Sequence, residues 1–557
     1  MILWSQTKKT ARRVVGKLRP QRTLTPKGRR DISETFDIVT IGSGHNGLVA
    51  AAYLAAAGKR VAVLERNSWF GGGVITRELT VPGFKHDQHS TAHIFILGNP
   101  LIKNDDLKLL SRYGLKYVYP EVPFICVFED GATIGLHRDR NKTAQDIAQF
   151  SAKDADAFQK FAAIAAGFLP LVAATFYAPP MPMGASLAML DQSEIGRQLF
   201  ALMYKSAYDV VIENFENERV RLFLCRLISE NLTGPEEKGT ALGLYVFLAF
   251  METYGVGVPI GGSGALSQAL IRCIEDHGGT VLADRPVERV LTRNGRAVGV
   301  RTSNGTEYTV KDAVIGAIHP HVLGAMVPDV DPVIAEAARR TEISANVCFT
   351  VHAALNEPLR FKAGSHVNNA YFTELMPSRL DDLRGFFDSL RYGKIPNRSL
   401  IGLISASTFD PSRCPPGKAT LHIWDYVPYA HPDGGAAAWD RLKESFGQTI
   451  LSRVRPFVEN LGPDNIIAGH YDSPLDMERT SASFRGGDLH GVANHMYQSG
   501  AHRPTPDLGR NTVPGIERLY LVGPFQHPGG GVFGAGRATA MQVCEDLKID
   551  FDKIGKA

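Results

Sequence analysis

Three glycines and one acidic residue near the start of the chain have the types and spacing of a dinucleotide-binding site. Gly42, Gly44 and Gly47 form a G-x-G-x-x-G pattern, and Glu65 follows about 20 residues later. Gly42 permits a tight turn, Gly44 lets a pyrophosphate approach the backbone, and Gly47 allows a helix and a strand to pack closely. The carboxylate of Glu65 suits ribose hydroxyls and disfavours a 2′-phosphate, so the pattern is unfavourable for NADP. The alternative is a glycine-rich turn in another kind of α/β protein.

The secondary structure predicted around these residues fits a dinucleotide-binding site. Phe36 to Ile41 predicts a buried strand, Asn46 to Ala57 a helix, and Arg60 to Leu64 a second strand that ends at Glu65. The helix N-terminus supplies free N–H groups for phosphates. A second cluster, Gly71 to Gly73, follows Glu65 and Arg66. This arrangement resembles the FAD-binding glutathione-reductase-type superfamily, and it favours FAD over NAD.

A second glycine-rich strand-turn-helix lies near the C-terminus. Arg518 to Val522 predicts a strand that Gly523 ends, His527 to Val532 an open turn, and about 534–547 a helix. The positive end of that helix would stabilise negative charge on a reduced flavin. A plain loop is the alternative for the turn.

The two glycine-rich segments combine with a third, PIGGSGALSQAL followed by DAVIGAIHP, and together the three resemble the phytoene-desaturase-like flavoproteins. The nearest branch resembles the carotenoid desaturases and ketolases and the pyridine-nucleotide-disulfide-oxidoreductase-domain-2 proteins. The resemblance implies dehydrogenation or desaturation of a lipophilic substrate, often at a membrane surface. It also implies these FAD contacts: Gly42, Gly44, His45, Asn46, Gly47, Glu65, Arg66, Gly72, Gly73, Val287, Gly523, Gly530, Gly531 and Val532.

The predicted fold class is α/β, with a Rossmann-type FAD-binding domain assembled from discontinuous segments and an α+β substrate domain with a helical, apolar region. We expect the FAD-binding domain to comprise residues 34–100, 256–320 and 501–557. The substrate-binding domain would comprise 101–255 and 321–500, including strands at 347–354 and 418–427 and a long helix at 439–461.

Histidines are the candidates for moving a proton, because their charge changes near neutral pH. His89 and His527 come first, since both lie in segments that the fold should bring to the flavin ring. The weaker candidates are His86, His93, His319, His495, Glu252 and Tyr254. For each one a structural or surface role is the alternative. No Ser/His/Asp or Cys/His motif is present, so hydrolysis is not indicated.

Apolar helical patterns fill residues 144–255. They suit either a plain helical core or a lipophilic substrate tunnel whose mouth faces a membrane. Helices are expected at 195–208, 220–228 and 241–253, and 176–183 is too proline-rich for one. The longest apolar run, Phe161 to Phe176, is interrupted by Pro170 and falls short of the ~20 residues that span a bilayer.

The first 33 residues form a basic arm, with ten Lys and Arg residues and no acid in the first thirty. It suits a solvated tail, an arm on an anionic membrane, or an organellar transit peptide. We therefore expect a cytoplasmic protein, peripheral to a membrane or free of it, or a mitochondrial one if the arm is a transit peptide. The rest of the chain is mildly acidic, which argues against nucleic acid as a partner. The six scattered cysteines contain no C-x-x-C pair and predict no metal site.

Two other functions remain open from the sequence. One is a flavin amine or alcohol oxidase on the same fold, and the other is a Rab-escort-like binding protein that has lost its flavin. The intact set of Gly42, Gly44, Gly47 and Glu65 argues against the second. The electron acceptor, oxygen or a quinone-like carrier, is unknown from the sequence.

Overall fold

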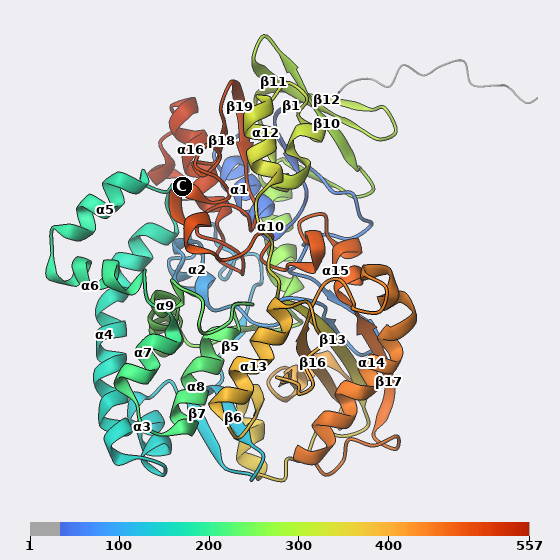
Figure 1. Cartoon of the computed structure of the whole chain (residues 1–557). Helices are drawn as coiled ribbons and strands as arrows, with labels where there is room; N and C mark the ends of the chain where they lie inside the picture. Colours follow the sequence, from blue (N-terminus) through green and yellow to red (C-terminus); the bar gives the residue numbers. More distant parts are fainter. Residues whose placement is uncertain (1–33, 556–557) are drawn as a thin grey trace, which may run out of the picture.

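The computed structural model describes residues 34–555 and contains two large sheets with helices around them. Figure 1 shows the first sheet at the top of the molecule, the second at the lower right, and a group of helices at the lower left. The fold is therefore mixed α/β, as predicted at that level. The basic arm of residues 1–33 lies outside the described residues.

The first sheet has eight strands, and its core runs parallel. The strand order is β10-β11-β19-β12-β1-β2-β9, with β18 paired to β19. The strands are β1 (Glu34–Ile41), β2 (Val61–Leu64), β9 (Thr280–Leu282), β10 (Val287–Arg293), β11 (Arg296–Thr302), β12 (Glu307–Gly316), β18 (Thr512–Val513) and β19 (Ile516–Leu521). β1 pairs in parallel with both β12 and β2. Three distant segments of the chain thus form one sheet.

Helix α1 (His45–Ala56) connects β1 to β2 and packs between α10 (Gly264–Asp276) and α16 (Gly536–Leu547). Ala50, Ala51, Ala52 and Ala55 of this helix are at most 1% exposed, which explains the small side chains. A Cβ on Gly536 would lie 1.9 Å from the backbone oxygen of Asn46, so α16 can approach α1 closely only because this residue is glycine. The close contact brings the C-terminal turn to the end of β1.

The second sheet has seven strands in the order β17-β13-β16-β15-β14-β6-β7. They are β6 (Val122–Phe128), β7 (Thr133–Leu136), β13 (Val347–Leu355), β14 (Ala370–Met376), β15 (Gly402–Ile404), β16 (Ala419–Val427) and β17 (Ile466–Asp472). Every residue of β13, β14 and β16 is buried. The predicted helix over 439–461 is shorter: α14 (Trp439–Val454) is followed by a 3₁₀ turn, Arg455–Phe457, in which Pro456 has no N–H to donate to an α-helical hydrogen bond.

A group of helices lies along the left side of Figure 1, and its lowest member, α3 (Arg140–Ala148), packs against β7 at the end of this sheet. The others are α4 (Ala152–Phe176), α5 (Met183–Asp191), α6 (Glu194–Leu202), α7 (Ala207–Asn214), α8 (Glu218–Ser229) and α9 (Thr240–Tyr254). The helix expected over 195–208 is two helices, because Ser206 caps α7 and forms a capping box with Asp209. The segment 177–182 is non-helical, as predicted.

The expectation that Pro170 interrupts the long apolar run was wrong. α4 is continuous over 25 residues with Pro170 inside it. Pro170 is exposed, so water can satisfy the carbonyl that its missing N–H leaves without an intrahelical partner. By length and composition α4 could cross a membrane, the one such helix in residues 34–555. In the most apolar 18-residue stretch of α4, 33% of the residues are buried within the protein. α4 packs against α9.

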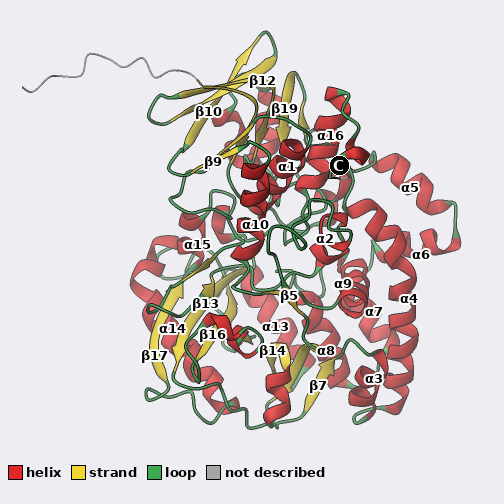
Figure 2. Cartoon of the chain, turned by 180° about the vertical axis from the view of Figure 1, so that it is seen from behind, coloured by secondary structure: helices red, strands yellow, loops and turns green. Residues whose placement is uncertain are grey.

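The remaining elements are mostly short, and some of them are labelled in the view from behind in Figure 2. They are β3 (Thr76–Arg77), β4 (His86–Asp87), β5 (Tyr117–Val118), β8 (Val258–Pro259), α2 (Pro100–Lys103), α11 (Leu323–Met326), α12 (Pro332–Arg339), α13 (Leu380–Arg391) and α15 (Pro474–Thr480). The predicted domain boundaries stay a prediction.

Candidate functional site

A cavity of about 550 Å³ begins where β1 and β2 end and runs toward the second sheet. The turn from β1 into α1 forms its first wall. Gly42 has φ +85°, a conformation that L side chains rarely adopt. A Cβ on Gly72 would lie 2.9 Å from the Cα of Gly44. The two glycine clusters therefore pack backbone against backbone, as their spacing suggested.

Glu65 is the buried acid of this wall. Its Oε2 accepts hydrogen bonds from the backbone N–H of Ser43 at 2.9 Å and from the Ser43 hydroxyl at 2.7 Å. Its Oε1 accepts from the backbone N–H of Asn67 at 2.9 Å. These bonds fix the carboxylate between the end of β2 and the first glycine turn, and the residue still lines the cavity.

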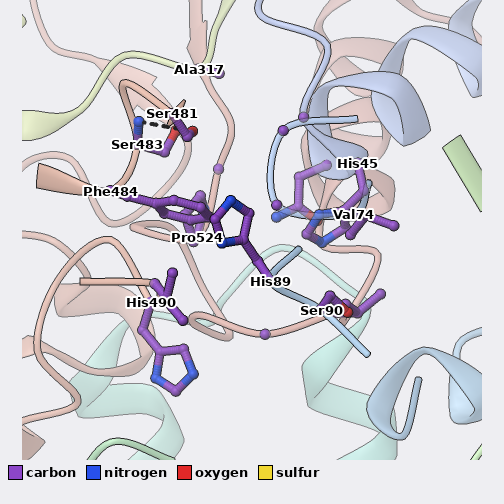
Figure 3. Close-up of a pocket in the computed structure, with 18 of the residues that line it drawn as sticks. His45, Val74, His89, Ser90, Ala317, Ser481, Ser483, Phe484, His490 and Pro524 are labelled. Carbon is purple, nitrogen blue, oxygen red and sulfur yellow. Dashed lines mark hydrogen bonds between the residues drawn. The ribbon is translucent and has the colours of Figure 1, made fainter. Parts of the chain in front are cut away.

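Side chains from several segments form another part of the cavity wall (Figure 3). The rings of His89 and Phe484 meet edge to face, with centroids 5.1 Å apart. Burial lowers the pKa of His89 to about 4, so this imidazole is neutral at pH 7. Neither of its ring nitrogens has a hydrogen-bond partner in the protein. His89 is therefore free to meet a ligand here.

The cavity gathers most of the residues that the sequence singled out. Those that line it are Gly42, Gly44, His45, Asn46, Gly47, Glu65, Arg66, Gly72, Gly73, His89, Val287, Gly523, Gly531 and Val532. His527 and Gly530 do not line it, contrary to the expectation that both reach one site. They line a second cavity, and His527 Nε2 lies 3.0 Å from the Thr175 carbonyl oxygen. The cis peptide before Pro528 belongs to this turn.

The weaker proton-transfer candidates lie away from both cavities. Burial lowers the pKa of His86, His93 and His319 to about 3 in each case. Glu252 forms an ion pair with Arg140, with 2.7 Å between Oε2 and Nη2. His86, His93, His319, His495, Glu252 and Tyr254 are all missing from the two cavity walls. A role of these six residues in proton transfer stays a prediction.

The second cavity has a volume of about 510 Å³ and is mostly apolar. It lies between α4, α5, α6 and α9, and it meets the first cavity at Phe95 and Asn231, which line both. Phe95 stacks on Phe533 with ring centroids 4.3 Å apart. The two cavities thus adjoin at an aromatic constriction.

Several residues of the first cavity escaped the sequence analysis. Among them are Phe95, Glu230, Asn231, Phe247, Phe372, Leu489 and His490. One signal was present: Arg226 and Glu230 are four residues apart within an otherwise apolar helical stretch. A charged pair in such a stretch requires a buried partner or a site. The others became neighbours only through the fold.

The protein atoms around the first cavity fit FAD. Gly44 has φ −56° and ψ 150°, and a Cβ there would meet no protein atom within 4 Å, although the residue lines the wall. Asn46 Oδ1, Asn46 Nδ2 and His45 Nε2 are buried without a partner. Buried polar atoms are nearly always paired, so unpaired ones at a helix N-terminus indicate a polar ligand. In residues 34–555, no group of three or more His, Cys, Asp or Glu residues could hold a metal ion.

The fold and the site together define a class of FAD-dependent oxidoreductases. The profile of the family described as flavin containing amine oxidoreductase matches residues 47–540, and the chain belongs to this family. An oxidoreductase from Methanosarcina mazei shares the fold, with a TM-score of 0.59 at 17% identity over 91% of this chain and 99% of that one. Cyclohexylamine oxidase from Brevibacterium oxydans does so with a TM-score of 0.56 at 17% identity, over 92% and 99%.

Relatives in sequence cover nearly the whole chain. A component of the limonene dehydrogenase of Castellaniella defragrans is 27% identical, over 92% of this chain and 95% of its own length. Pyridine nucleotide-disulfide oxidoreductase domain-containing protein 2 of Mus musculus is 28% identical, over 92% and 94%. A lycopene-forming phytoene desaturase of Pseudescherichia vulneris is 26% identical, over 92% and 99%. The resemblance to the phytoene-desaturase-like flavoproteins is confirmed, and the protein is an FAD-dependent oxidoreductase.

Proposed function

We propose that the protein dehydrogenates a lipophilic small molecule of the terpenoid or isoprenoid kind, which binds in the apolar cavity beside the FAD. The observation that carries this proposal is the 510 Å³ cavity itself, a volume typical of small-molecule sites. Its wall includes Leu171, Phe176, Met189 and Leu199. The names of the relatives that act on limonene and phytoene support the same substrate class.

We further propose that β1, α1 and β2 form a Rossmann-type unit for the FAD, and that the second sheet with the helices forms the substrate domain. Bound FAD supplies the acceptor for the two electrons and the hydrogen that leave the substrate. Glu65 would hold the ribose, and the N–H groups at the start of α1 the pyrophosphate. Phe95, Phe247 and Phe372 would exclude water at the reacting end of the site.

The outer wall of the apolar cavity supports the entry of the substrate from a membrane. α5 has no buried residue, and it projects at the left edge of the molecule in Figure 1. Met181 and Met189 line the cavity and are 41% and 39% exposed. Exposed apolar side chains around an opening are characteristic of sites that take ligands from membranes. We propose a peripheral membrane contact at this mouth.

An amine oxidase remains the second candidate, because the family carries that activity in its name. The wall of the apolar cavity favours the first candidate. An amine oxidase would use an aromatic cage at the flavin, and the aromatic residues Tyr497, Tyr520 and Phe525 line neither cavity. Among the described residues, no Asp or Glu side chain lines the apolar cavity to pair with an ammonium group.

The experiment is anaerobic bleaching of the bound flavin by a panel of terpenoids, carotenoids, alcohols and amines. We expect bleaching by terpenoids and slower bleaching in Ser186→Trp, since Ser186 lines the apolar cavity from α5. Ala185→Trp is the matched control, because Ala185 is exposed on the same helix and lines neither cavity. Bleaching by amines alone would refute the proposal, and so would equal rates in the two variants.

A further inference from the structure

The first cavity, of about 550 Å³, is called the FAD cavity below. A small third chamber of about 130 Å³ opens beside it. The two share His89, Thr91, Glu230, Phe372, Leu489 and His490 as lining residues. Strands β13 and β16 form the far wall, with Thr350 from β13 and His422 from β16. A larger share of the wall is therefore polar in this chamber than in the apolar cavity.

The chamber lies close to the junction of the other two cavities. Glu230 lines the chamber and the FAD cavity, and its neighbour Asn231 lines the FAD cavity and the apolar one. On the other side, His490 lines the chamber, and its Nδ1 lies 2.8 Å from Nδ2 of Asn494, which lines the apolar cavity. Asn494 Nδ2 also donates to the Asn231 carbonyl at 3.2 Å. The chamber and the apolar cavity thus both border the FAD cavity, and a ligand in the apolar cavity can reach the chamber by way of the FAD cavity.

The chamber wall holds polar atoms that the protein leaves without partners. Thr350 is 3% exposed, and its hydroxyl has no hydrogen-bond partner. Both ring nitrogens of His89 also lack a hydrogen-bond partner. Leaving a buried polar group unpaired is unfavourable, so the arrangement favours a ligand that brings its own donor and acceptor.

Among the described residues, Glu230 is the one acidic side chain that lines the chamber, and it is paired with a cation. That cation is Arg226, which is fully buried and also makes an ion pair with Glu374 at 2.5 Å. Burial raises the pKa of Glu374 well above its usual value. Burial also lowers the pKa of His422 and of His490 to about 4, so both are neutral at pH 7.

We propose that the chamber is a subsite for a neutral hydroxyl group of the substrate, whose apolar body lies in the apolar cavity. This proposal rests on the proposed function, and it narrows the substrate class to amphipathic alcohols. A water molecule occupies about 30 Å³, so 130 Å³ suits a hydroxyl with one or two carbons and not a longer chain. Because the one acidic side chain on its wall, Glu230, is paired with Arg226, the chamber wall gives an ammonium group no free counter-ion.

The test compares three ligands with one carbon skeleton: 3,7-dimethyloctan-1-ol, the corresponding 1-amine, and 2,6-dimethyloctane. Each is titrated anaerobically into dithionite-reduced holoenzyme by equilibrium dialysis, so that binding is measured without turnover. We expect the alcohol to bind at least tenfold more tightly than the hydrocarbon. Because a purely apolar site would favour the hydrocarbon, this order is diagnostic.

Two matched threonine variants locate the effect. Thr350→Val keeps the shape and removes the hydroxyl from the chamber, and we expect the preference for the alcohol to fall severalfold. Thr420→Val is the control, because Thr420 is also 3% exposed with an unpartnered hydroxyl but does not line the chamber. The Thr420→Val variant should keep the wild-type preference for the alcohol over the hydrocarbon.

Three results would overturn the proposal. Equal binding of the alcohol and the hydrocarbon would refute the hydroxyl subsite, and the apolar cavity would still be supported as a substrate site. Tighter binding of the amine would show an uncompensated negative charge in the chamber. Failure of all three ligands to bind the FAD-loaded protein would overturn the proposed function as well.

Discussion

The space above Gly44 provides the sharpest test of the FAD site. Alanine fits the backbone there, because φ is −56° and ψ is 150°, and its Cβ would meet no protein atom within 4 Å. Gly44 nevertheless lines the cavity beside the N-terminus of α1. If that space belongs to a pyrophosphate, Gly44→Ala affects ligand binding and leaves folding intact.

The two effects can be estimated separately. A substitution without strain or clash changes the free energy of unfolding by about 0.5 kcal/mol or less. A methyl group forced into a well-packed contact costs about 1–3 kcal/mol. For Gly44→Ala this corresponds to a dissociation constant for FAD that is about 5-fold to 150-fold higher than in the wild type.

The assay is a fluorescence titration of the apoprotein with FAD, together with urea unfolding of the same apoprotein. Gly385→Ala in α13 is the control, since a Cβ there also meets nothing within 4 Å and Gly385 does not line the cavity. This control should keep the wild-type affinity, and alanine in the helix should stabilise the fold by up to ~1 kcal/mol. Wild-type FAD affinity in Gly44→Ala would refute the assignment of the phosphate position.

Two further predictions concern single buried side chains. Glu65→Ala removes the carboxylate that we expect to bind the ribose and that accepts the hydrogen bond from the Ser43 N–H. The affinity for FAD should therefore fall about 10-fold to 100-fold. An unchanged affinity in the same titration would contradict the ribose role. His319 donates from Nε2 to the Gly491 carbonyl at 2.7 Å, and burial lowers its pKa from 6.5 to about 3, so its contribution to stability is present above pH 6.5 and is lost as the pH falls toward 3. The stability difference between wild type and His319→Asn, measured by urea unfolding, should therefore shrink by about 2 kcal/mol between pH 7.5 and pH 5, and a difference independent of pH would contradict this.

Local motifs allowed a large part of the first sheet to be predicted. The strand at 36–41, the helix at 46–57 and the strand at 60–64 appear as β1, α1 and β2, with small shifts at their ends. The periodicity, the glycines and Glu65 all lie within one short stretch, so neighbours in sequence decide this structure. The same applies to the turn from β19 into α16.

Predictions failed where a residue's environment is made by distant segments. Pro170 lies inside α4 because packing against α9 supports the helix around it, which no local rule could reveal. His527 follows a glycine-rich turn as expected, yet the position of that turn against α4 sends its side chain to the apolar cavity.

The sequence by itself therefore determined the cofactor and the family, because the FAD motifs are contiguous and their geometry is local. Only the tertiary structure decided what surrounds the reacting end of the cofactor. Glu230 gains its environment from Arg226 one helical turn away and from Glu374 in another sheet strand, 148 residues from Arg226. Such a charge balance depends on burial and on contacts between distant strands and helices, and neither is a property of the local sequence.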